Sequence, residues 1–239
     1  MRGWARVHGG MLPLLALDID GTLLRTRGAG REALDEAFLD RYGWPAATEG
    51  VHVAGATDDV ICRDVAARFG VVWQAQHTPA LRERYLVALR RRLADPTRTE
   101  VLPGVEALLD AVEGRAHVAL LTGNWVAGAH EKLAAAGLAA RFEWGVYSED
   151  AVDRDGLVPA ARARAEARGL EVGEVVVIGD TVADIRCARA GGARVVVVET
   201  GFSTPEALTL ARPDLQVPDL ARGLGWCLAL CGLQSGAGV

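Results

Sequence analysis

The sequence is poor in lysine and has no long apolar run. Lys132 is the only lysine among 239 residues, so arginine supplies nearly all of the 26 basic side chains, and the formal net charge is -5. An acidic chain argues against a general binder of nucleic acid or anionic membranes. No segment approaches the roughly 20 continuous apolar residues of a membrane span. We therefore expect neither a nucleic-acid nor a membrane partner.

Cysteine is also sparse. The four cysteines are scattered and form no Cys-x-x-Cys motif, which excludes the disulfide framework of a small secreted domain. Cys227 and Cys231 lie one helical turn apart, and we expect buried free thiols in a C-terminal helix rather than a metal or redox pair. A reducing, cytoplasmic setting follows.

The N-terminus superficially resembles a signal peptide, because two arginines precede an apolar stretch that starts at Met11. That stretch runs straight into Asp18 without a small-residue cleavage site. We interpret it as the first strand and residues 1–10 as a flexible tail.

The first strand ends abruptly at two carboxylates, in the order Asp18-Ile-Asp20-Gly-Thr22. A short apolar run closed by a Gly-Thr turn is typical of a buried parallel strand, whose carboxyl end is where open α/β sheets bind ligands. Residues two apart on a strand point to the same side, so the carboxylates of Asp18 and Asp20 can bind the same ligand or ion. A hard cation such as Mg²⁺ would relieve their repulsion. The alternative is a polar turn that merely caps the strand.

The rest of the chain predicts an α/β fold with a doubly wound parallel sheet and an inserted helical cap. We assign residues 11–25 and 99–239 to the core and residues 26–98 to the cap. The cap has helical patterns near 31–42, 58–69 and 78–93, the last opened by Thr78 and Pro79. Helices and strands then alternate: helices at 103–113, 125–136, 159–168 and 183–190, and strands at 118–121, 144–147, 175–178 and 194–198.

Three of the predicted strands end in an oxygen-bearing side chain, at Asp18, Thr122 and Asp180. The carboxyl ends of parallel strands share one edge of the sheet, so these residues should form one site. Thr122-Gly123-Asn124 precedes a helix whose free N–H groups could hold phosphate oxygens, although a plain N-cap is the alternative. Asp184 lies one turn into its helix, where capping explains it as well as a functional role does.

The ordered motifs resemble those of the haloacid dehalogenase (HAD) superfamily, namely its phosphatases with a helical cap between the first two motifs. They are Asp18-x-Asp20-Gly-Thr22, Thr122-Gly-Asn124 and Gly179-Asp180-Thr-x-x-Asp184. The stretch Gly55-x-Thr57-Asp58 and the tail from Gly201 to Asp219 most resemble phosphoglycolate phosphatase-like proteins. The resemblance implies a HAD-like Rossmannoid core and a Mg²⁺-dependent phosphomonoesterase that acts on a small phosphorylated metabolite.

The same resemblance implies roles for individual residues. Asp18 would attack phosphorus to form an aspartyl-phosphate, and Asp20 would protonate the leaving oxygen and later activate water. Asp18, the backbone carbonyl of Asp20 and Asp180 would hold Mg²⁺, with Asp184 behind them. Thr122, Gly123 and Asn124 would bind phosphate. A phosphomutase of the same fold and a non-catalytic, receiver-like phosphate acceptor are the alternatives.

The third motif departs from the family, because no lysine precedes Pro159. We expect Arg154 to replace it, with Arg162 as the second candidate, and we expect Lys132 to lie on the surface. The planar guanidinium group of an arginine would bind phosphate through two parallel hydrogen bonds, whereas the ammonium group of a lysine acts as a point charge. Residues of the cap determine which substrate binds. The candidates to line the entrance of the active site are His52, Thr57, Asp58, Trp44 and Trp125.

Overall fold

The computed structural model describes residues 11–233, so the expected tail of residues 1–10 lies outside the described part. Its centre is a six-stranded sheet in the order β5-β4-β1-β6-β7-β8, and every pairing in it is parallel. The strands are β1 (Leu12–Leu17), β4 (His117–Leu121), β5 (Gly145–Val146), β6 (Val172–Gly179), β7 (Arg194–Val198) and β8 (Leu215–Val217). The predicted α/β class and parallel sheet are confirmed.

Strand β1 lies at the centre of the sheet because both of its faces are apolar. Leu15 and Leu17 belong to one hydrophobic cluster, whereas Leu14 and Ala16 belong to a second one on the opposite face. Leu15 pairs with Val118 of β4 on one side and with Val176 of β6 on the other. The polar end of β1 is therefore held between two neighbouring strand ends.

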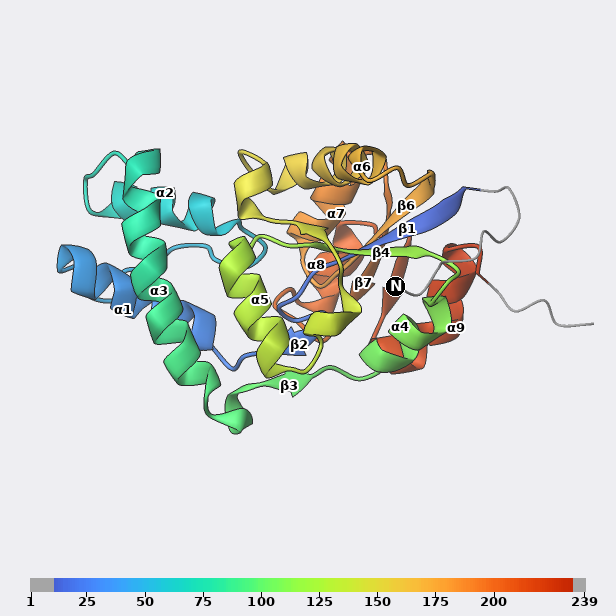
Figure 1. Cartoon of the computed structure of the whole chain (residues 1–239), viewed down its shortest axis with the longest axis horizontal. Helices are drawn as coiled ribbons and strands as arrows, with labels where there is room; N and C mark the ends of the chain where they lie inside the picture. The colour runs from blue at the N-terminus through green and yellow to red at the C-terminus, as the bar shows by residue number, and fades with distance from the viewer. Residues whose placement is uncertain (1–10, 234–239) are drawn as a thin grey trace, which may run out of the picture.

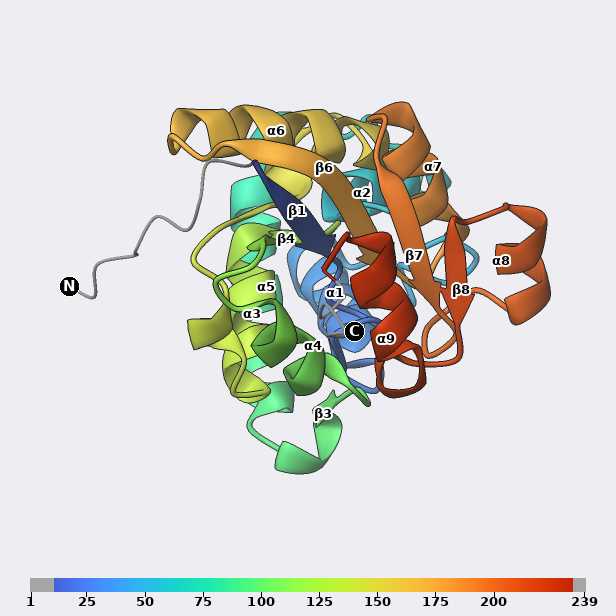
Figure 2. The same cartoon turned by 90° about the vertical axis from the view of Figure 1, so that its right-hand side faces the viewer.

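Helices cover both faces of the sheet (Figure 2). The face of Leu15 packs against α4 (Val105–Val112), α5 (Val126–Ala135) and α9 (Leu220–Leu230). The opposite face packs against α6 (Leu157–Ala167), α7 (Val182–Ala190) and α8 (Pro205–Leu210). This is the doubly wound arrangement that alternating helices and strands predict.

The cap helices α1 (Ala29–Tyr42), α2 (Asp58–Arg68) and α3 (Thr78–Leu93) lie to one side of the sheet (Figure 1). They share a hydrophobic core of their own, which includes Phe38 and Leu89 and also receives Trp125 from the sheet domain. An antiparallel ribbon of β2 (Leu24–Arg25) and β3 (Glu100–Val101) connects the two parts. The ribbon supports our proposal that the cap spans residues 26–98.

Several short elements were not predicted. Strands β2 and β3 are two residues long, too short for an alternating pattern to show, and α8 and β8 follow the last predicted strand. Short 3₁₀ turns cover Ala75–His77, Pro96–Arg98, Ala139–Arg141, Ser148–Asp150 and Arg154–Gly156. Helix α6 starts two residues before Pro159, because proline is tolerated in the first turn of a helix.

All four cysteines are buried and free, including Cys227 and Cys231, for which buried free thiols were predicted. Among residues 11–233, no helix is both long and apolar enough to cross a membrane.

Candidate active site

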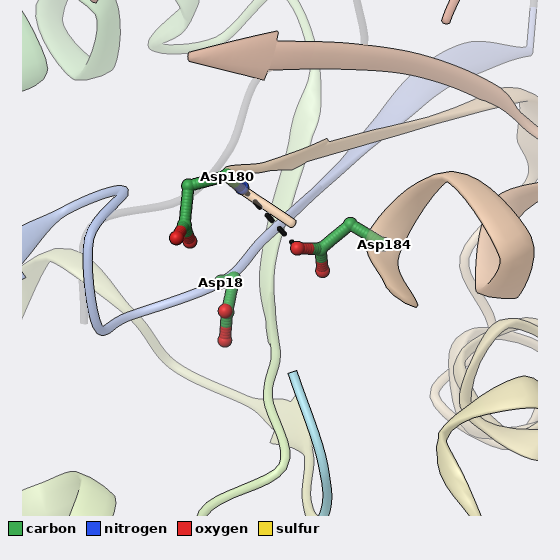
Figure 3. Close-up of side chains that lie close together, drawn as sticks. All are labelled: Asp18, Asp180 and Asp184. Atoms are coloured by element: carbon green, nitrogen blue, oxygen red, sulfur yellow. Dashed lines mark hydrogen bonds between the residues drawn. The ribbon is translucent and has the colours of Figure 1, made fainter. Parts of the chain in front are cut away.

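Three aspartates meet at the carboxyl edge of the sheet (Figure 3). Asp18 follows β1, Asp180 follows β6, and Asp184 lies in the first turn of α7. All three are buried, and one carboxylate oxygen of each lies within 4.8 Å of the others. The ends of β1 and β6, two of the three strand ends that the sequence predicted to converge, therefore meet in the structure.

Groups from two loops hydrogen-bond to the Asp180 carboxylate. The Thr22 hydroxyl donates to Oδ1 at 3.1 Å, and the Phe202 backbone N–H donates to Oδ2 at 2.8 Å. Two glycines make room for it: a Cβ on Gly21 would lie 2.6 Å from Oδ2, and one on Gly201 only 1.8 Å away. These glycines allow the backbone to close around the carboxylate.

Asp184 caps helix α7 and also lies beside Asp18 and Asp180, so the predicted capping role is confirmed and a functional role stays a prediction. Its Oδ2 accepts hydrogen bonds from the Thr181 backbone N–H at 2.9 Å and from the Thr181 hydroxyl at 2.6 Å. The Asp180 backbone N–H also donates to Oδ2, at 3.2 Å (Figure 3). Its other oxygen, Oδ1, accepts from Arg154.

Because Asp18, Asp180 and Asp184 are buried close together, ionising all three carboxyl groups at once is unfavourable. Burial raises the pKa of Asp18 to about 6, opposed by the Arg154 guanidinium and reinforced by the Asp184 and Asp20 carboxylates. Burial, with Asp184 and Asp18 nearby, also raises the pKa of Asp180 well above its ordinary value. A buried set of oxygen donors that repel one another fits a hard divalent cation such as Mg²⁺.

Asp20 lies in a network with the only lysine of the chain. Its Oδ2 accepts from Lys132 Nζ at 2.5 Å and from Asn124 Nδ2 at 2.8 Å, and Lys132 Nζ also donates to Asn124 Oδ1 at 2.6 Å. Lys132 is only 4% exposed, so the expectation of a surface residue is wrong. It follows Gly128 and Ala129 at helical spacing on the buried face of α5, and this spacing was the signal in the sequence.

Arg154 is 3% exposed and lies on the other side of the site. Its Nη2 is 3.0 Å from Asp18 Oδ2 and also bonds to Asp184. Its Nε is buried without a hydrogen-bond partner among the described residues. Asp153 caps the 3₁₀ turn that carries Arg154, accepting from the Asp155 backbone N–H at 3.1 Å. Arg162, by contrast, is exposed.

The loop Thr122-Gly123-Asn124 lines the site, but the N-terminus of α5 is less open than expected. The Trp125 N–H donates to Asp58 Oδ2 at 2.7 Å, and the Val126 N–H donates to Glu149 Oε2 at 3.1 Å. The Asn124 side chain bonds to Asp20 and to the Thr122 hydroxyl. Protein groups therefore occupy N–H donors that the sequence suggested for phosphate.

A cavity of about 500 Å³ lies between the core and the cap. Asp18, Asp20, Lys132 and Arg154 line its floor, together with Thr122, Gly123 and Asn124. The hinge and cap contribute both charged and apolar side chains, namely Arg25, Arg27, Arg31, Leu34, Val53, Asp58, Ile61 and Tyr85. Residues of both the core and the cap therefore line the site.

Of the five cap and entrance candidates, Asp58 lines this cavity. Burial raises the pKa of Asp58 to about 7, although Lys132 opposes the shift. The other four do not line the cavity that the described residues form. Thr57 caps α2 by accepting from the Val60 N–H, Trp44 stacks on Phe69 with ring centroids 4.7 Å apart, and Trp125 is fully buried in the cap core.

Residues 12–192 match the family model described as haloacid dehalogenase-like hydrolase. The chain belongs to this family. A probable phosphatase of Dickeya dadantii, IndB, is 27% identical over 234 residues, covering 94% of this chain and 97% of the relative. A phosphoglycolate phosphatase of Pectobacterium atrosepticum is 27% identical over 204 residues, covering 84% and 86%.

Solved structures show the same HAD fold. A hydrolase from Pseudomonas syringae superposes with a TM-score of 0.71 at 23% identity, covering 90% of this chain and 96% of that one. CbbY from Rhodobacter sphaeroides, solved with phosphate, superposes with a TM-score of 0.66 at 18% identity, covering 89% and 96%. The family match and the phosphatase names of the curated relatives identify this HAD protein as a phosphatase and do not favour the mutase or receiver alternatives.

Proposed function

We propose that this HAD-family phosphatase hydrolyses phosphomonoesters of small metabolites, with Asp18 as nucleophile and Asp20 as general acid and base. The observation that carries the proposal is the different environment of the two carboxylates. Asp18 lies with Arg154 among the buried acids, whereas Asp20 is bonded to Lys132 and Asn124 beside the cavity. Two carboxylates in different surroundings can perform two different tasks.

In the first step, an Asp18 carboxylate oxygen forms a bond to phosphorus while the bond from phosphorus to the ester oxygen breaks. The leaving oxygen keeps the electron pair and takes a proton from Asp20. In the second step, Asp20 takes a proton from water, whose oxygen attacks phosphorus and releases Asp18 and inorganic phosphate. Arg154 contacts Asp18 directly, so its charge would stabilise the negative charge of the phosphoryl group during transfer.

Asp18, Asp180 and the backbone carbonyl of Asp20 would hold Mg²⁺, and Asp184 would orient the neighbouring Asp180 backbone and Arg154. The ion would supply positive charge against the phosphate oxygens. Thr122, Gly123 and Asn124 lie on the cavity floor, where we propose that they contact the phosphate.

The relatives named phosphoglycolate phosphatase make 2-phosphoglycolate the first substrate to test. A cytoplasmic setting remains part of this proposal and is supported by four buried free cysteines.

The decisive experiment is a kinetic panel of 2-phosphoglycolate, sugar phosphates and p-nitrophenyl phosphate with Mg²⁺. We expect release of inorganic phosphate, and product analysis of the sugar phosphates should show dephosphorylation without isomerisation. Failure to hydrolyse any of these esters would contradict the proposed function.

A further inference from the structure

We propose that Lys132 is a positioning residue that fixes the carboxyl group of Asp20 so that Oδ1 exchanges the proton with the substrate. The inference rests on the proposed role of Asp20 and adds a specific task for the only lysine of the chain. It concerns the protonation of the leaving group, a part of the reaction in which Arg154 takes no direct part.

The hydrogen bonds of Asp20 distinguish its two oxygens. Oδ2 accepts from Lys132 at 2.5 Å and from Asn124 at 2.8 Å. Oδ1 accepts from no side chain among residues 11–233, and the Asp20 side chain remains 22% exposed where it lines the cavity. Two donors on Oδ2 oppose rotation of the carboxyl group, so Oδ1 is left to meet the substrate.

The ammonium group is also held in place. Asn124 Oδ1 accepts from Lys132 Nζ at 2.6 Å while its Nδ2 donates to Asp20, so the three side chains form a closed triangle. A buried ammonium group is costly unless it is paired and hydrogen-bonded, and both conditions are met here. The triangle therefore has one stable arrangement.

One helix glycine leaves space for this lysine, and a second leaves space for its neighbour Tyr85. A Cβ on Gly30 of α1 would lie 3.3 Å from Lys132 Nζ and 3.4 Å from its Cε. A Cβ on Gly128 of α5 would lie 3.0 Å from Cε1 of Tyr85, a buried cap residue that also lines the cavity. The two glycines therefore accommodate Lys132 and Tyr85 where the cap meets the core.

The two buried cations near the reacting carboxylates have separate partners. Arg154 contacts Asp18 and Asp184, whereas Lys132 contacts Asp20 and Asn124. Loss of Arg154 should therefore slow phosphoryl transfer whatever the leaving group is. Loss of Lys132 should matter most when the leaving oxygen needs a proton.

Aryl phosphates of similar size test this difference. p-Nitrophenolate is a stable anion and leaves without protonation, whereas phenolate is more basic and benefits from an acid. We expect Lys132→Met to raise the ratio of kcat/KM for p-nitrophenyl phosphate to that for phenyl phosphate by about tenfold, a fraction of what a general acid supplies. Arg154→Met, the matched control, should lower both values while leaving the ratio unchanged.

Two further variants guard against a purely structural effect. Lys132→Arg keeps a charged donor and should restore part of the phenyl phosphate activity. Gly30→Ala retains the lysine but crowds Nζ, so it should change the ratio in the same direction by a smaller factor, and it replaces Lys132→Met if circular dichroism shows that Lys132→Met is unfolded.

An unchanged ratio in a folded Lys132→Met protein, or in Gly30→Ala when that variant replaces it, would overturn the inference while leaving the proposed function intact. If the wild-type protein hydrolyses neither aryl phosphate with Mg²⁺, the proposed function fails and the inference fails with it.

Discussion

The guanidinium group of Arg154 lies 3.0 Å from the carboxylate of Asp18, although 135 positions separate the two residues in the chain. Asp18 directly follows strand β1, and Arg154 occupies the 3₁₀ turn that leads into α6. Their contact places a permanent positive charge beside the proposed nucleophile. Burial of both side chains shields the pair from solvent and strengthens its electrostatic interaction.

Asparagine substitutions test the two aspartates that we propose to be catalytic with little change in side-chain volume. We expect Asp18→Asn to abolish turnover and to prevent covalent phosphate capture, because an amide is a poor nucleophile. Asp20→Asn should also abolish steady-state turnover of alkyl phosphates. Initial rates and intact-mass spectrometry after mixing with substrate provide the measurements, and circular dichroism checks the fold. A wild-type rate in either variant would contradict the mechanism.

Removal of divalent cations should abolish activity, because the buried acids need a compensating charge. We expect Mg²⁺ to restore turnover and Ca²⁺ to inhibit it, since Ca²⁺ adopts looser and higher coordination. Binding can be measured without turnover: Mg²⁺ should raise the Tm of the wild-type protein and have a much smaller effect on Asp180→Asn. Full activity after exhaustive chelation would exclude the metal assignment.

The sequence predicted the sheet and the acidic cluster because both depend on local patterns. The apolar run before Asp18 and the valine run before Asp180 each specify a buried strand, and parallel strands share their carboxyl edge. The position of Arg154 near Pro159 identified the candidate that the structure places against Asp18. Its catalytic role remains a prediction.

Helical spacing could have shown that Lys132 lies on the buried face of α5, but the sequence could not show what it binds, because its partners lie outside that helix. A lysine in a helix is usually solvent-exposed, and the triangle with Asp20 and Asn124 exists only once α5 packs beside β1. The same holds for the Trp125 N–H, which the cap residue Asp58 occupies. Contacts between cap and core depend on tertiary packing, which no local pattern specifies.

The buried carboxyl of Asp58 should make stability depend on pH. Its pKa is raised from 3.8 to about 7 by burial, so the folded state binds a proton more tightly than the unfolded chain does. Stability should therefore fall as pH rises from about 4 to about 7, by at most about 1.4 kcal/mol per pH unit. Asp58→Asn keeps an acceptor for the Trp125 N–H and removes the charge.

Urea unfolding at pH 5 and pH 8 measures this effect. The decrease in the free energy of unfolding between the two pH values should be smaller for Asp58→Asn than for the wild-type protein. An equal decrease in both proteins would show that Asp58 does not titrate in this range.

Arg154 offers the sharpest test of the departure from the family pattern. We expect Arg154→Ala to lower kcat by a factor on the order of 10² to 10³, the loss typical of one electrostatic stabiliser of a transition state. Arg154→Lys should recover only part of the rate, because one ammonium group cannot reproduce both the Nη2 contacts with Asp18 and Asp184 and the Nη1 hydrogen bond to the Gly55 carbonyl. Arg162→Ala is the matched control: this arginine is exposed and should be dispensable. Wild-type turnover in Arg154→Ala together with an inactive Arg162→Ala would move the role to Arg162, against the geometry of the site.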